Sequence, residues 1–326
     1  MIYITDYIDN PTIELDIIGK NLCSFSDEKV EYSLVTVLLV WHFSVNEESL
    51  KRFPNVKSII RYGVGFDNID LEFCKKHSIK VFNNPDYGVD EVSDTALSMI
   101  MSLSRCIESY NIKSRELVLH PNKEKPWQEN TDKRAKRLKE MTLGLVGVGR
   151  IGSSLAIKMK NIVGDIHFFD PEVASGYEKV LNATRHNSLE DLLSNADIVS
   201  IHAPLSPSTQ NLIDDNFINN MRDGSILVNT ARGSILKSHS CLYQGLISGK
   251  LSGVAFDVLP SEPPILDSND KLLSAWINNN KNFMGRIIIN PHTAYYSEES
   301  YQEMRLKAAT SALNALTNNQ FANRII

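Results

Sequence analysis

Short apolar runs alternate with amphipathic stretches along the first third of the chain. Each run is the length of a strand and is rich in β-branched or aromatic residues, and the stretches between them fit helices. This alternation predicts βαβ units that build a parallel sheet. In sequence letters the runs are MIYIT from Met1, TVLLVW from Thr36, SIIRY from Ser58 and IKVF from Ile79.

A long helical pattern comes next, from Glu91 to Leu119, with apolar residues three and four positions apart. The polar segment from His120 to Lys139 follows, and its prolines and many charges predict an exposed excursion from the fold. A last helical pattern covers residues 297–316.

Strand and helix patterns alternate again after this excursion. Apolar runs that each end in a polar residue or a turn indicate a second doubly wound sheet. The predicted fold class is therefore α/β, with two doubly wound parallel-sheet domains of the Rossmann or flavodoxin-like type and a cleft between them. The runs are LGLVGVG, DIHFFD, ADIVSIH, GSILVNTA and SGVAFD.

Composition and charge narrow the function classes. Apolar residues make up 42% and charged residues 22% of 326 residues, as in soluble globular proteins of about two domains. The formal net charge of -5 gives no basic surface for a phosphate backbone, so no nucleic-acid partner is expected. No run is long enough to cross a bilayer and no secretory leader is visible, so the expectation is a cytoplasmic protein without a membrane partner. Four scattered cysteines predict neither a metal site nor a disulfide framework.

The segment TLGLVGVGRIG carries Gly147, Gly149 and Gly152 in a Gly-x-Gly-x-x-Gly pattern between an apolar strand and a helix. This context predicts a dinucleotide turn, with the pyrophosphate at the helix N-terminus. Asp170 ends the next strand, where a carboxylate can accept hydrogen bonds from the ribose hydroxyls and disfavours a 2′-phosphate. The predicted cofactor is therefore NAD rather than NADP. The alternative is a plain glycine turn with a solvated aspartate.

Four blocks resemble the signature segments of the D-isomer-specific 2-hydroxyacid dehydrogenases. The likeness covers nearly the whole chain, keeps the order and spacing of the blocks, and is closest to the C-terminal-binding-protein-like branch of that family. The blocks are RYGVGFDNID from Arg61, NTARGS from Asn229, FDVLPSEPP from Phe256 and NPHTAYYSEE from Asn290.

The resemblance implies a catalytic trio of Arg232, Glu262 and His292. A guanidinium can bind the carboxylate of a 2-oxo acid and polarise its carbonyl. An imidazole can donate the proton that the nascent alkoxide requires, and the reverse reaction uses the same group as a base. A glutamate beside it can fix the tautomer and stabilise the imidazolium. Taken singly, the three residues could equally be a surface cation, a loop charge and a structural histidine.

Further positions follow from the same motifs. The resemblance implies NAD contacts in the turn and at the ends of the later strands, and substrate contacts around a second glycine loop, whose glycines could also be simple turn residues. The implied NAD contacts are Gly147, Gly149, Arg150, Ile151, Gly152, Asp170, Ala203, Pro204, Thr209, Thr230, Ala231, Arg232, Asp257 and His292. The implied substrate contacts are Val64, Gly65, Arg232, His292 and Tyr295.

The resemblance also implies the domain plan and the activity. Residues 1–99 with 296–326 would form a discontinuous substrate-binding domain, and 100–295 the NAD-binding Rossmann domain, as a homodimer. The predicted function is that of an NAD-dependent oxidoreductase that moves a hydride reversibly between NADH and a small 2-oxo acid. The alternatives are an NAD(H)-sensing binding protein of the corepressor type and a phosphoglycerate dehydrogenase of serine synthesis. The chain departs from the family pattern at Val92 and at Lys237 and Ser238.

Overall fold

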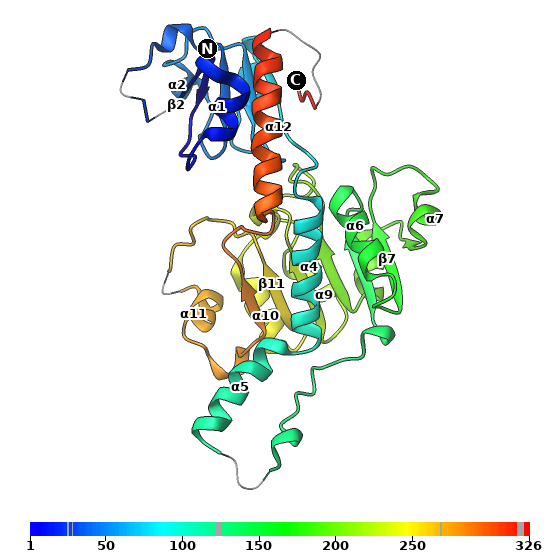
Figure 1. Ribbon diagram of the computed structural model, residues 1–326. Coiled ribbons are helices and arrows are strands. Elements are labelled where there is room, and N and C mark those ends of the chain that lie inside the picture. Colours follow the sequence, from blue (N-terminus) through cyan, green and yellow to red (C-terminus); the bar gives the residue numbers. More distant parts are fainter. Residues whose placement is uncertain (25, 28, 122–124, 268, 318–322) are drawn as a thin grey trace. The chain divides into compact units, whose positions relative to one another are not determined.

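The computed structural model divides the chain into two compact units (Figure 1). Unit 1 comprises Met1–Gly88 with Tyr295–Ile326, and unit 2 comprises Val89–Ala294. The structure describes residues 1–24, 26–27, 29–121, 125–267, 269–317 and 323–326.

Unit 1 contains a parallel sheet with the strand order β2-β1-β3-β4-β5 among the described residues. Alternate residues of its strands enter two separate cores, because successive side chains point to opposite faces. Helices α1 and α12 pack on one face, and α2 and α3 pack on the other. The strands are β1 (Ile2–Ile4), β2 (Leu22–Ser24), β3 (Val37–Val40), β4 (Ser58–Arg61) and β5 (Lys80–Phe82), and the helices are α1 (Thr12–Ile18), α2 (Glu47–Leu50), α3 (Leu71–Lys76) and α12 (Glu298–Thr317).

A buried ion pair joins the two distant pieces of unit 1. Arg305 on α12 donates to both carboxylate oxygens of Glu14 on α1, at 3.0 and 2.6 Å. The Tyr62 hydroxyl donates to the same carboxylate at 3.1 Å. Burial and the Glu14 charge raise the pKa of Tyr62 well above its usual range, so it remains a donor. Removing Arg305 or Glu14 would leave an unpaired buried charge. The pair therefore fixes the C-terminal helix α12 to the N-terminal helix α1.

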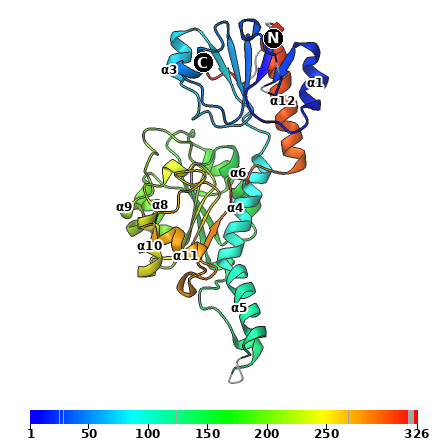
Figure 2. The ribbon, with the colours of Figure 1, turned by 90° about the vertical axis from the view of Figure 1, so that its left-hand side faces the viewer.

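Unit 2 contains a second parallel sheet, with the order β12-β11-β10-β9-β6-β7-β8 among the described residues. Its central strands are buried on both faces, as expected where helices cover a parallel sheet on both sides. Helices α4, α6 and α7 cover one face, and α8 to α11 cover the other (Figure 2). The strands are β6 (Thr142–Val146), β7 (Asp165–Phe169), β8 (Thr184–Arg185), β9 (Ile198–Ile201), β10 (Ser225–Asn229), β11 (Leu251–Phe256) and β12 (Ile287–Ile289). The helices are α4 (Val89–Ser104), α5 (Ile107–Leu119), α6 (Arg150–Met159), α7 (Tyr177–Leu181), α8 (Leu189–Asn195), α9 (Asp215–Asn220), α10 (His239–Ser248) and α11 (Lys271–Ile277).

The fold class predicted from the sequence, two doubly wound α/β domains, is confirmed. The single helix predicted from Glu91 to Leu119 is wrong, because the chain breaks it at Cys106, which has a left-handed φ of 55° and separates α4 from α5. The contact boundary between the units falls at Gly88 and Val89, before α4, whereas the sequence placed the border inside that helix.

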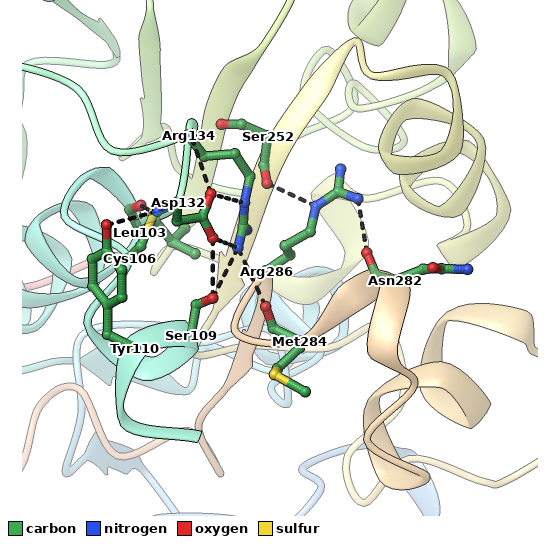
Figure 3. Close-up of polar contacts among 10 residues, drawn as sticks. All are labelled: Leu103, Cys106, Ser109, Tyr110, Asp132, Arg134, Ser252, Asn282, Met284 and Arg286. Atoms are coloured by element: carbon green, nitrogen blue, oxygen red, sulfur yellow. Dashed lines mark hydrogen bonds and ion pairs between the residues drawn. The ribbon is translucent and has the colours of Figure 1, made fainter. Parts of the chain in front are cut away.

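Helix α5 and the described segment after it leave the body of unit 2 as an arm, residues 107–121 and 125–139 (Figure 1). Polar contacts fix the base of this arm (Figure 3). Arg134 forms an ion pair with Asp132 at 2.5 Å and donates to the Met284 carbonyl at 3.4 Å. The Ser109 hydroxyl donates to Asp132 at 3.1 Å. Gly285, at a φ of 63°, has no room for a Cβ, which would lie 2.3 Å from the backbone nitrogen of Ser109. The base of the arm is therefore rigidly attached to the β12 edge of the sheet.

Candidate active site and cofactor turn

The glycine turn lies between β6 and β9, where the strand order reverses in unit 2. Gly147 has a φ of 91°, and a Cβ on it would lie 2.8 Å from the nitrogen of Ala203, which follows β9. A Cβ on Gly152 would lie 2.2 Å from the Gly147 carbonyl oxygen. A Cβ on Gly149, by contrast, would point into open space, with no atom within 4 Å. Two glycines are thus required by the turn itself, and the third leaves backbone exposed for a close-lying ligand.

The Asp170 carboxylate lies beside this turn, as the sequence predicts. One oxygen accepts the backbone N–H of Val148 and the other accepts that of Glu172, each at 2.9 Å. Each carboxylate oxygen can accept a further hydrogen bond. The group can therefore still receive ribose hydroxyls while its orientation is fixed by the backbone.

Other predicted NAD contacts lie at the carboxyl ends of neighbouring strands. Arg150 and Ile151 begin α6, directly after the turn. Pro204 follows β9, and its carbonyl accepts the Thr209 hydroxyl at 2.6 Å. The Thr230 hydroxyl, after β10, is buried and has no hydrogen-bond partner in the part of the chain that the structure describes. An unsatisfied buried hydroxyl at this edge is suited to a ligand, since such groups are normally paired.

His292 and Glu262 form a hydrogen-bonded pair in unit 2. His292 Nδ1 lies 2.6 Å from Glu262 Oε2, and Glu262 Oε1 accepts the Leu259 N–H at 2.8 Å. Burial raises the pKa of Glu262, but the hydrogen bonds from His292 and Leu259 and the charge of Arg232 outweigh it and hold the pKa below its usual value. An ionised carboxylate only accepts, so the Nδ1 atom carries the proton. His292 therefore presents its other ring nitrogen, Nε2, for proton exchange.

Arg232 belongs to a loop that packs against the loop of Glu262. It follows β10, and the next residue, Gly233, packs so closely on the Leu259 carbonyl that a Cβ would lie 1.9 Å from that oxygen. Leu259 in turn donates to Glu262. The Arg232 guanidinium donates to the Ala231 carbonyl at 2.7 Å. The structure thus brings the loops of all three predicted catalytic residues together in one unit.

Asp257 has a local role that the sequence did not indicate. Its carboxylate accepts the backbone N–H groups of Thr293 and Ala294 at 3.0 Å, and its carbonyl accepts that of His292 at 2.9 Å. His292 has a left-handed φ of 55°, which is uncommon for histidine. Asp257 therefore stabilises the strained backbone that carries the imidazole. Its predicted contact with the nicotinamide stays a prediction.

A pocket of about 480 Å³ adjoins the Glu262–His292 pair. This volume lies in the range of small-ligand sites. Its lining is mostly apolar and includes Leu259, Glu262, Pro263, Pro264, Trp276, Ile289, Asn290, Pro291 and His292.

The remaining predicted substrate contacts lie in unit 1. The Val64 carbonyl accepts the Asn83 side chain at 2.7 Å, and Val64 is followed directly by Gly65. The Tyr295 ring lies against Trp41 and Tyr87, with centroids at 6.5 and 6.2 Å. Their role as substrate contacts stays a prediction.

His202, which lies under the glycine turn, should make the free energy of unfolding depend measurably on pH. Burial lowers its pKa to about 4, and its Nε2 atom lies 2.9 Å from the Ser200 hydroxyl. In the unfolded chain the pKa of a histidine is near 6.5. Because folding lowers the pKa of His202, its contribution to the free energy of unfolding is fully present above pH 6.5 and is lost as the pH falls towards 4. Between pH 7 and pH 4.5 the loss is roughly 2 kcal/mol, at about 1.4 kcal/mol per unit. Urea unfolding at both pH values measures this effect: between pH 7 and pH 4.5 the free energy of unfolding should fall by about 2 kcal/mol less in His202→Gln than in wild type. Equal changes in the two proteins would contradict the lowered pKa of His202.

The comparisons with known proteins agree with this geometry. Residues 97–294 match the family model of the D-isomer specific 2-hydroxyacid dehydrogenase NAD binding domain. The chain is 31% identical to D-3-phosphoglycerate dehydrogenase of Bacillus subtilis, over 96% of this chain and 58% of that protein. It is 30% identical to glyoxylate reductase of Thermofilum pendens, over 83% and 75% of the two chains. It superposes on D-lactate dehydrogenase from Aquifex aeolicus, solved with NAD and lactic acid, with a TM-score of 0.80, 27% identity and coverage of 98% and 96%.

The chain therefore belongs to the D-isomer specific 2-hydroxyacid dehydrogenase family, whose members are NAD-dependent oxidoreductases. Its matched domain binds NAD, and the residues present fit that cofactor. The space beside the backbone of Gly149 is empty of protein atoms, and Asp170 can accept further hydrogen bonds. The buried Thr230 hydroxyl has no hydrogen-bond partner among the described residues. The chain spans a little over half the length of the Bacillus relative. Among the described residues, no helix is long and apolar enough to cross a bilayer, and no cluster of three metal-ligating side chains is present.

Proposed function

We propose that this chain catalyses reversible hydride transfer between NADH and the 2-carbon of a small 2-oxo acid, yielding a D-2-hydroxy acid. The observation that carries the proposal is the 2.6 Å hydrogen bond between His292 Nδ1 and Glu262 Oε2. This pair and Arg232 belong to the domain that holds the dinucleotide turn. A protein that only sensed NAD(H) would need the turn but not a positioned proton donor.

In this reaction bound NADH supplies the hydride, and the side chains supply charge and a proton. Arg232 binds the substrate carboxylate and polarises the carbonyl through charge-assisted hydrogen bonds. His292 donates a proton from Nε2 to the oxygen that becomes the hydroxyl. Glu262 keeps the imidazole in the required orientation and stabilises its cationic form. In the oxidative direction the same imidazole, neutral, removes the hydroxyl proton.

A panel of 2-oxo acids tests this proposal. The purified protein should oxidise NADH, followed at 340 nm, with at least one of glyoxylate, hydroxypyruvate, phosphohydroxypyruvate, pyruvate and 4-methyl-2-oxopentanoate, and should use NADPH much less well. The product should be the D-isomer on chiral chromatography. Phosphohydroxypyruvate distinguishes the activity named for the Bacillus relative from the others. Absence of turnover with every acid, despite measurable NADH binding, would favour the sensor alternative.

We also propose that the protein is a cytoplasmic homodimer. Its four cysteines are buried free thiols, in accord with a reducing compartment. On α5, Ser109 is the one buried residue of the described helix, while Val118 and Leu119 are 69% and 73% exposed. A helix of 13 residues is marginal in water without a packing partner, and a second copy of the arm would provide one.

The dimer is tested by sedimentation equilibrium. Wild type should have twice the chain mass of 36.7 kDa, and the double variant Val118→Glu, Leu119→Glu should be monomeric, because four carboxylates would be buried in the interface. Ile247→Glu, at an exposed apolar site on α10, is the control and should stay dimeric. A monomeric wild type at micromolar concentration would refute the proposal.

A further inference from the structure

One guanidinium holds the segment that follows β7. Arg185 Nη2 donates to the carbonyls of Asp170 and Val173, each at 3.0 Å, and Nη1 donates to the Ala174 carbonyl at 3.2 Å. Its guanidinium carbon also lies 6.0 Å from the centroid of the Phe168 ring on β7. The half-buried Arg185 thus closes the segment 170–174 into a fixed loop.

The fixed loop carries the carboxylate that faces the adenosine ribose in the dinucleotide fold. Inside the loop, Asp170 is fixed by its own contacts with Val148 and Glu172. The backbone carbonyl of the same residue is fixed by Arg185. Both the side chain and the main chain of Asp170 are therefore restrained, and the second restraint comes from β8, which pairs with β7 at Phe168 and Arg185.

The positively charged guanidinium of Arg185 already interacts with backbone carbonyl groups. An arginine at this end of a dinucleotide site can bind the 2′-phosphate of NADP. Here three backbone carbonyls accept hydrogen bonds from the two terminal nitrogens of the guanidinium. The fork geometry of arginine matches these carbonyls in a way that the single ammonium of lysine cannot. Binding a 2′-phosphate would require breaking these contacts.

We propose that Arg185 is a positioning residue for the adenosine ribose of NAD and a determinant of selectivity for NAD over NADP. It acts through Asp170: by holding the 170–174 loop, it keeps the carboxylate where the ribose hydroxyls bind and keeps its own cation away from a 2′-phosphate. The inference uses the proposed function only in taking NAD as the ligand.

Calorimetry with adenosine fragments tests the inference without any turnover. Arg185→Met should weaken binding of ADP-ribose about tenfold, which corresponds to about 1.4 kcal/mol, and should leave the weaker binding of 2′-phospho-ADP-ribose within twofold. The ratio of the two affinities should therefore fall about tenfold. Arg185→Lys should give an intermediate ratio, because a lysine can satisfy one carbonyl at a time.

The control is Arg222→Met, which removes an arginine of the same domain that pairs with Asp197 at 2.9 Å; its affinity ratio should equal that of wild type. An unchanged ratio in Arg185→Met, or an equal loss for both fragments, would overturn the inference, since a merely structural arginine would weaken both alike. If Arg185→Met does not fold, as judged by circular dichroism, the ratio for Arg185→Lys decides, and a wild-type ratio there refutes the role. If no 2-oxo acid is reduced but the ratio falls, the proposed function fails and this inference stands.

Discussion

Replacing His292 with asparagine should lower kcat for 2-oxo acid reduction by about 10²- to 10⁴-fold, the usual contribution of a general acid. Asparagine is the informative replacement, because it tolerates the left-handed φ of 55° at this position. Its amide can still donate to Glu262, so the backbone and the local hydrogen bond are kept while the transferable proton is removed. Steady-state kinetics at saturating NADH measures the effect.

The control for this variant is cofactor affinity. NADH binding, measured by fluorescence titration, should stay within about threefold of wild type, because the proton donor is not needed to hold the dinucleotide. A kcat within threefold of wild type would reject His292 as the acid. A parallel loss of NADH affinity would instead indicate that the substitution also disturbs the cofactor site, where the resemblance implies a contact of His292.

The variant Glu262→Gln separates the two roles of Glu262, which orients the His292 imidazole and supplies a negative charge beside it. The Leu259 N–H already requires an acceptor on this side chain, so the Gln amide nitrogen would face His292 Nδ1. The imidazole would then accept at Nδ1 and carry its only proton on Nε2, as a weaker acid than the imidazolium. This explains why the negative charge, and not only a hydrogen-bonding side chain, is expected at position 262.

The trio is predicted from blocks that resemble the signature segments of the family, and the order of the strands adds a physical reason why site residues gather at one edge of the sheet. Parallel strands place their carboxyl ends at one edge, so Arg232 after β10 and Asp170 after β7 were bound to lie at the same edge of the sheet. The glycine pattern was equally informative, since the close contacts of Gly147 and Gly152 leave no other residue type that fits.

Other features depend on contacts that no local pattern reveals. The break at Cys106 was missed because the helical spacing of apolar residues continues across it, and the pattern does not encode the packing of Ser109 on Gly285. Arg185 lies well beyond the fingerprint in sequence, and only the pairing of β8 with β7 brings it to Asp170. The hydrogen bonds that the His292 segment donates to Asp257 likewise join two loops that are distant in sequence.

Replacing Gly149 with alanine should weaken NADH binding by about ten- to a hundredfold while leaving the fold as stable as wild type. The new methyl would meet no protein atom within 4 Å, and the backbone φ of −65° is ordinary for alanine. It would, however, occupy the space in which the pyrophosphate approaches the turn. An overpacked contact of this kind costs about 1–3 kcal/mol, and calorimetric titration with NADH would measure it.

Gly152→Ala provides the contrast that makes this prediction specific. Its methyl would lie 2.2 Å from the Gly147 carbonyl oxygen, so the turn itself must move. This variant should therefore lose both NADH affinity and thermal stability, with a midpoint lower by several degrees. If Gly149→Ala bound NADH as tightly as wild type, the pyrophosphate could not lie against this backbone. The two glycines differ in that a methyl group at position 149 would meet no protein atom. If Gly149→Ala nevertheless lost thermal stability as Gly152→Ala does, its weaker NADH binding would have to be assigned to a distorted turn.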